Sequence, residues 1–162
     1  MKILYIIRHA KSSWKNLDLD DFDRPLNKRG KHDAPMMGKR LRKKKIMPDL
    51  ILSSPAKRAK MTVKSIAKKV HYDKKIVFEK SIYEADEHIL QSIVKTIDDK
   101  YNITFLIGHN PGLNDLIESY VSFDENLPTC GVVCIRFTCK HWSDTNSKNA
   151  TLSFVDYPKR LT

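Results

Sequence analysis

Short apolar runs alternate along the chain with longer segments that mix apolar and charged residues. Four runs are nearly continuous in apolar residues and lie at residues 2–7, 49–53, 76–78 and 103–107. Runs of this kind are typical of strands that are covered on both faces of a parallel sheet. Two further runs, at residues 131–137 and 151–155, are joined by a polar loop over 140–149. We therefore predict strands in all six places.

The segments between the first runs carry apolar residues at helical spacing. They predict helices over residues 27–45, from 54 to about 69, over 87–99 and over 111–121. Asn27 and Ser54 are residue types that cap helix N-termini, and Pro55 fits the first helical position. Pro35 lies inside the first segment, where it should kink the helix or delay its start.

Strands that alternate with helices indicate an α/β fold. The pattern predicts a three-layer α/β/α sandwich with a mostly parallel central sheet. The 162 residues fit one domain, and the sequence has no internal repeat and no linker rich in Gly, Ser or Pro. We therefore predict a single domain over residues 1–162.

The chain is strongly basic, with 30 Lys and Arg residues against 19 Asp and Glu and a formal net charge of +11. Such a charge is compatible with a polyanionic partner, such as nucleic acid or an anionic membrane. However, the basic residues lie largely at helical spacing, as over 39–45 and 57–69, which is typical of solvated helix faces. Base recognition would also require aromatic residues between the basic ones, and these helices largely lack them. We expect a phosphorylated partner rather than nucleic acid.

No segment has the length of a membrane span or of a secretion signal. The apolar run at residues 3–7 ends at Arg8 after five residues. A signal core needs about 7–15 apolar residues and a membrane span about 20. We therefore expect a cytoplasmic protein without a membrane partner. Cys130, Cys134 and Cys139 form no CxxC pair, which favours buried residues of a strand and its exit over a metal site.

Cationic and nucleophilic residues follow three of the predicted strands. Arg8 and His9 follow the first strand, Arg58 comes soon after the second, and His109 follows the strand at 103–107. The carboxyl ends of parallel strands meet at one edge of a sheet, so we expect these side chains to lie together. Arginine binds phosphoryl oxygens through a permanently charged fork, and a neutral imidazole is a competent nucleophile near neutral pH. The set therefore predicts phosphoryl-transfer chemistry.

The carboxylates of the sequence do not accompany these positions as a tight cluster, so we predict neither a metal ion nor a cofactor. Four of them are crowded in one loop that we interpret as solvated: Asp18, Asp20, Asp21 and Asp23. Arg24 is interpreted as the partner of a structural salt bridge. Trp14 and Trp142 are interpreted as packing residues rather than ligand platforms.

Five segments resemble, in order, the motifs of the histidine phosphatase superfamily, which includes the cofactor-dependent phosphoglycerate mutases. Arg8-His9-Ala10 resembles the Arg-His-Gly signature, with alanine in place of glycine. The other four segments lie at residues 23–27, 53–58, 82–84 and 108–112. With residues 8–14, the series looks most like the compact branch related to phosphohistidine phosphatases of bacterial phosphorelays. The similarity runs from Met1 to about Tyr157.

The resemblance implies a phosphoglycerate mutase-like fold and a phosphatase that works through a phosphohistidine intermediate. His9 would be the nucleophile, neutral at its attacking nitrogen. Arg8, Arg58 and His109 would surround the phosphoryl group and neutralise the charge of the transition state. His109 would be protonated, or at least a hydrogen-bond donor.

Two further residues have roles that the resemblance leaves less defined. Glu84 falls about where larger relatives place their general acid, and it could equally be a polar residue at the start of the following helix. Asn16 resembles a phosphate-contacting residue of relatives, although its spacing from the histidine differs by one residue.

Three functions remain open at this point. The first is a protein phosphohistidine phosphatase, which is favoured because only about 24 residues separate Arg58 from Ile82, too few for the cap with which larger relatives select small substrates. The second is a phosphatase of the same fold that acts on a small phosphate ester. The third is a catalytically silent module that binds phosphoprotein or nucleic acid. The net charge favours this third function, but binding alone would not need His9.

Overall fold

The computed structural model describes residues 1–160, and within them six strands form one sheet in the order β3-β2-β4-β1-β5-β6. The strands are β1 (Lys2–Arg8), β2 (Leu50–Ser53), β3 (Val77–Phe78), β4 (Ile103–Gly108), β5 (Val132–Phe137) and β6 (Ala150–Asp156). The first four run parallel to one another, β5 is antiparallel to β1, and β6 is antiparallel to β5. The sheet is therefore mostly parallel, as predicted.

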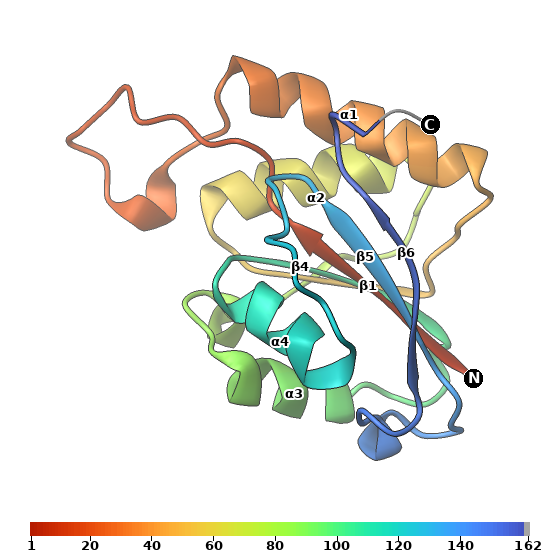
Figure 1. Ribbon diagram of the computed structural model, residues 1–162. Helices are drawn as coiled ribbons and strands as arrows, with labels where there is room; N and C mark the ends of the chain where they lie inside the picture. The colour runs from red at the N-terminus through yellow and green to blue at the C-terminus, as the bar shows by residue number, and fades with distance from the viewer. Residues whose placement is uncertain (161–162) are drawn as a thin grey trace.

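Two pairs of helices cover the two faces of this sheet. The helices are α1 (Lys28–Lys43), α2 (Lys57–Lys69), α3 (Glu87–Lys95) and α4 (Gly112–Tyr120). Short 3₁₀ helices lie at η1 (Asp21–Asp23), η2 (Lys80–Ile82) and η3 (Trp142–Asp144). Helices α1 and α2 cover one face, and α3 and α4 cover the other (Figure 1). The three-layer α/β/α prediction is confirmed.

The alternation of side chains along β1 explains why its sequence is apolar throughout. Leu4 and Ile6 belong to the core beneath α3 and α4, whereas Tyr5 and Ile7 belong to the core beneath α1 and α2. All four side chains are buried. Full burial of a side chain of this size contributes about 1.5–3 kcal/mol, so the central strand stabilises both layers at once. The residue that follows this strand is thereby held in a rigid setting.

The start of α1 agrees with the predicted cap, whereas the start of α2 does not. Asn27 does cap α1, because its side-chain oxygen accepts a hydrogen bond from the Gly30 amide at 2.9 Å. The helix then runs through Pro35 from Lys28 onward, so the expected delay of its start is wrong. The predicted cap at Ser54 is also wrong, because α2 begins only at Lys57, with Ala56 as its uncapped N-cap residue.

The described residues also bear on the expectations for membranes and cysteines. Within residues 1–160, no helix combines the length and apolar character needed to span a membrane. Cys130 and Cys134 are buried and Cys139 is partly exposed, and none of the three is in a disulfide. Burial raises the pKa of the Cys130 thiol to about 12, as is typical of a packing residue.

Candidate active site

The carboxyl ends of β1, β2 and β4 bring three of the predicted site residues together. The His9 and His109 ring centroids are 5.1 Å apart, and the Arg58 Nε atom donates to His9 Nε2 at 3.4 Å. His9 directly follows β1, Arg58 lies in the first turn of α2, and His109 directly follows β4. The parallel register of the strands sets this meeting, since Arg8 of β1 lies opposite Gly108 of β4.

The hydrogen bonds of His9 fix which of its ring nitrogens carries the proton. Its Nδ1 atom lies 2.7 Å from the carbonyl oxygen of Ala10. A carbonyl can only accept a hydrogen bond, so Nδ1 carries the hydrogen and Nε2 keeps its lone pair. Burial, together with the charges of Arg58 and Arg8, lowers the His9 pKa to about 3. The ring therefore stays neutral near pH 7, with a nucleophilic nitrogen that faces Arg58.

His109 is also neutral near pH 7. Burial, together with the charges of Arg58 and Arg8, lowers its pKa to about 4. Its Nε2 atom lies 2.7 Å from the Ser54 hydroxyl oxygen, and its buried Nδ1 atom has no partner among residues 1–160. The low pKa favours the expected alternative of a neutral hydrogen-bond donor, and protonation of His109 beside a phosphoryl group stays a prediction. Ser54, misread as a helix cap, instead holds this ring.

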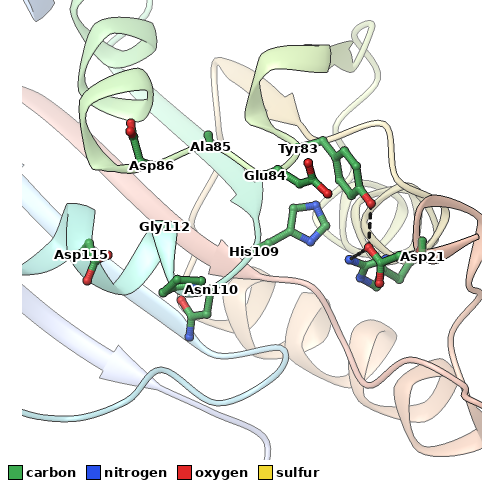
Figure 2. A pocket seen from close by; sticks show the side chains of 11 residues that line it. Asp21, Tyr83, Glu84, Ala85, Asp86, His109, Asn110, Gly112 and Asp115 are labelled. Atoms are coloured by element: carbon green, nitrogen blue, oxygen red, sulfur yellow. Dashed lines mark hydrogen bonds and ion pairs between the residues drawn. The ribbon is translucent and has the colours of Figure 1, made fainter.

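Asp21 joins the site although its loop was interpreted as solvated. Its carbonyl and its carboxylate accept from the two terminal nitrogens of Arg58, at 2.6 and 2.9 Å, and its carboxylate also accepts from the Tyr83 hydroxyl at 2.6 Å (Figure 2). Partial burial alone would raise the Asp21 pKa, but the bonds from Tyr83 and Arg58 lower it to about 2. Asp21 thus holds the end of the guanidinium and leaves Nε directed at His9. Nothing in the sequence distinguishes Asp21 from the neighbouring aspartates.

Arg8 contributes charge from one side of the two histidines. One of its terminal nitrogens donates to the Leu127 carbonyl at 3.0 Å. Its Nε atom is buried and has no partner in the described part of the chain. The charge of Arg8 also contributes to the lowered pKa of both histidines.

A cavity of about 460 Å³ opens beside His109. Its walls come from the end of β4, the segment before α3, and η1, and the lining residues are Asp21, Arg58, Tyr83, Glu84, Ala85, Asp86, His109, Asn110, Pro111, Gly112 and Asp115. Figure 2 shows the side chains of Glu84 and Tyr83 beside the His109 ring. Glu84 is exposed and adopts a left-handed backbone with φ of 59°. It lies before α3 and not in it, so a role in starting that helix falls to Asp86, whose side chain caps it.

Of the predicted site residues, Arg58, His109 and Glu84 line this cavity, whereas His9, Arg8 and Asn16 do not. Asn16 is exposed in the loop before η1, and its side-chain oxygen accepts from the Asp18 amide at 3.0 Å. The roles assigned to His9, Arg8, Arg58, His109 and Glu84 remain predictions that the geometry makes chemically reasonable. Within residues 1–160, no three His, Cys, Asp or Glu side chains are grouped as a metal site would require.

Comparison with known proteins places this site in a family. The model of the histidine phosphatase superfamily (branch 1) matches residues 4–120, which include all three strand-end residues described above. The chain belongs to branch 1 of the histidine phosphatase superfamily. An uncharacterized chloroplast protein of Arabidopsis thaliana is 31% identical over 150 residues, which cover 87% of this chain and 69% of the relative.

Solved structures place this histidine phosphatase near the compact SixA proteins. SixA from Agrobacterium tumefaciens superimposes with a TM-score of 0.84 at 25% identity, covering 97% of this chain and 98% of that one. The protein histidine phosphatase SixA complexed with tungstate superimposes with a TM-score of 0.82 at 16% identity, covering 96% and 97% of the two chains. The resemblance to the compact branch, the phosphoglycerate mutase-like fold and the prediction of a phosphatase are confirmed.

The two neutral histidines make the stability of this histidine phosphatase depend on pH. Their folded-state pKa values lie below about 6.5, the ordinary value, so the unfolded chain binds more protons between about pH 4 and 6.5. Stability from this source is fully present above that window and is lost as pH falls through it. Between pH 7 and pH 5, we expect the free energy of unfolding to fall by about 1–2 kcal/mol less in His109→Gln than in the wild type. Urea unfolding at the two pH values measures it.

The exposed His88, replaced in the same way, serves as the control for this measurement. His88→Gln should unfold with the pH dependence of the wild type. If His109→Gln also keeps that dependence, His109 is not held neutral by burial.

Proposed function

We propose that this histidine phosphatase removes phosphoryl groups from phosphohistidine side chains of proteins, without a metal ion, through a phosphohistidine intermediate on His9. The observation that carries the proposal is the state of His9. Its Nδ1–H donates to the Ala10 carbonyl at 2.7 Å, so Nε2 keeps its lone pair, which accepts a long hydrogen bond from Arg58 Nε at 3.4 Å. A nucleophile is thus placed directly beside a phosphoryl-binding cation.

The proposed reaction has two displacements at phosphorus. In the first, the His9 Nε2 lone pair forms a bond to phosphorus, the bond from phosphorus to the substrate nitrogen breaks, and the leaving imidazole takes that electron pair and a proton from solvent. In the second, a water oxygen attacks phosphorus and gives a proton to solvent, the bond to Nε2 breaks with its electron pair returning to Nε2, and inorganic phosphate leaves. His9 returns to its starting state, so no group is consumed.

Three cationic or donor groups support charge stabilisation by the protein itself. Arg58 points its Nε atom to the position where the phosphoryl group would lie, and His109 faces the same space from β4. A phosphoryl dianion beside His109 would raise its pKa and favour the protonated, stronger donor. Arg8 is the third cation, and its charge lowers the pKa of both histidines. Such preorganised donors are the usual means of phosphoryl-transfer catalysis.

The short connection between α2 and α3 supports a protein substrate. Residues 70–86 form β3 and η2 and no further domain that could cover the site. No large segment in this connection therefore covers the cavity beside His109, and a side chain of another protein can enter it. One fold neighbour is named a protein histidine phosphatase and is complexed with tungstate, a tetrahedral oxyanion like phosphate.

Glu84 favours a second candidate, the hydrolysis of a small phosphate ester. It lines the same cavity as His109, where a carboxylic acid could protonate the oxygen of a leaving alcohol. Phosphohistidine needs this help much less, because imidazole is a good leaving group. The two candidates therefore differ in how strongly the reaction depends on Glu84.

The test is phosphate release in excess EDTA from a phosphohistidine peptide and from a phosphoserine peptide. We expect wild-type protein to cleave the phosphohistidine peptide, and Glu84→Gln to change this rate by less than about threefold. If the ester is the substrate, Glu84→Gln should slow its hydrolysis by roughly 10²–10⁴-fold. The exposed Glu125, replaced by Gln, is the control for loss of a carboxylate elsewhere. Release from the ester alone would contradict the proposal and favour the second candidate.

A further inference from the structure

A loop beside the active site projects from the body of this histidine phosphatase. Residues 13–20, here called the arm, follow β1 and stand out from the two helical layers (Figure 1). The base of the arm is closed by the bridge between Ser12 and Leu26 and by the Ser13 amide, which donates to the Pro25 carbonyl at 2.8 Å. The arm is therefore a defined projection on a fixed base.

The arm exposes three large apolar side chains. Trp14, Leu17 and Leu19 are 66%, 86% and 38% exposed. The interpretation of Trp14 as a packing residue is thus wrong, whereas Trp142 is fully buried. A leucine as exposed as Leu17 adds nothing to the core. Apolar side chains that gather on one exposed feature mark an interaction surface.

Arg24 holds the arm in place and connects it to the active site. Its guanidinium lies 3.5 Å from the centre of the Trp14 ring, and it donates to the Ser12 hydroxyl at 2.9 Å. It also pairs with one carboxylate oxygen of Asp21 at 3.2 Å, while the other carboxylate oxygen holds Arg58. The Trp14 side chain is therefore linked through Arg24 to Asp21, which lines the cavity. Rigid, exposed aromatic side chains of this kind dominate the binding energy of protein interfaces.

Basic residues surround the base of the arm. Two hollows of about 600 and 330 Å³ lie between the arm and the start of α1. Their charged lining residues are Lys15, Lys28, Arg29 and Lys31, of which Arg29 is also paired with the buried Asp33 at 3.4 Å. The first turn of α1 has no acidic residue either, although its positive end would favour one. This part of the surface is complementary to a negatively charged partner.

We propose that the arm and the basic hollows form the docking surface for a folded, acidic protein that carries the phosphohistidine. An apolar patch of that protein covers Leu17 and Trp14, its carboxylates lie over the hollows, and its phosphohistidine enters the cavity beyond Asp21. This inference rests on the proposed function. The arm also carries Asp18 and Asp20 next to its apolar residues. These carboxylates disfavour a nucleic acid or an anionic membrane, whereas a protein surface can offer both signs of charge.

The experiment compares three substrates of increasing size. They are phosphoramidate, a phosphohistidine peptide, and the negatively charged phosphotransfer domain from which the peptide is taken, phosphorylated on its histidine. We expect wild-type protein to show at least about a tenfold higher kcat/KM for the domain than for the peptide. Leu17→Ser and Lys28→Glu should each reduce this preference severalfold, through KM, and leave phosphoramidate turnover within about twofold of wild type. Both residues are exposed, so neither change removes a core contact.

An exposed apolar residue outside the arm provides the control. Met47→Ser removes another exposed apolar side chain, 53% exposed and outside the arm, and should change nothing. A domain preference that both arm variants retain, or an equal loss on phosphoramidate, would overturn the docking surface. So would Leu17-dependent binding of anionic vesicles or of a single-stranded oligonucleotide with an unchanged domain preference. Failure of wild-type protein on all three substrates would instead refute the proposed function, and the docking inference with it.

Discussion

Replacing His9 with alanine is expected to reduce phosphate release by roughly 10⁴-fold or more, because the variant has no atom that can form the covalent intermediate. His9 is 7% exposed, and the change removes its bond to the Ala10 carbonyl without introducing a charge. The protein should therefore stay folded and keep its affinity for phosphate at Arg58. Single-turnover release of phosphate measures the rate, and denaturation of the wild type in alkali during turnover should retain phosphate on the protein.

The control for this variant is His88→Ala, which replaces an exposed histidine of α3. It should retain wild-type activity and the same trapped phosphate. A His9→Ala protein that keeps more than about one-tenth of the wild-type rate, or a wild type that never retains phosphate, would rule out His9 as the nucleophile.

The second large effect is expected at Arg58. Arg58→Ala should lower kcat/KM by about 10²–10³-fold, which is typical of removing one preorganised donor to a transition state. Arg58→Lys should recover only part of this loss, because an ammonium group has neither the fork that binds Asp21 nor the Nε atom that faces His9. Steady-state kinetics should show kcat/KM and the inhibition by tungstate decreasing together, since both depend on binding a tetrahedral oxyanion.

Arg42→Ala is the matched control, because Arg42 is an exposed residue of α1. It should leave both measurements unchanged. If Arg58→Ala loses less than about tenfold in kcat/KM, the Arg58 contact with His9 is structural and the phosphoryl group is held elsewhere.

The hydrophobic pattern located the strands well, because a strand buried on both faces has to be apolar along its whole length. β1 and β4 are examples, with Leu4, Ile6 and Phe105 fully buried. The pattern could not give the strand order, which depends on pairing between distant segments. It also misplaced the start of α2, since Ser54 and Pro55 have the composition of a helix start while the Ser54 hydroxyl is used by His109.

The rule that ligands bind at the carboxyl ends of parallel strands led to His9, Arg58 and His109. It could not lead to Asp21 or Tyr83, because both reach the site through loops whose paths are set by tertiary contacts. The low pKa of His109 could not be predicted for a related reason. Burial dominates its pKa, and burial is a property of the folded molecule that a list of nearby arginines does not reveal.

During synthesis on the ribosome, β1 emerges long before the strands on either side of it. It lies between β4 (Ile103–Gly108) and β5 (Val132–Phe137) and has no partner closer in sequence. A nascent chain therefore carries an unpaired apolar strand, which exposes it to aggregation or to chaperones until most of the polypeptide has been made. The same delay means that an incomplete chain that lacks β4 cannot hold His9 beside His109.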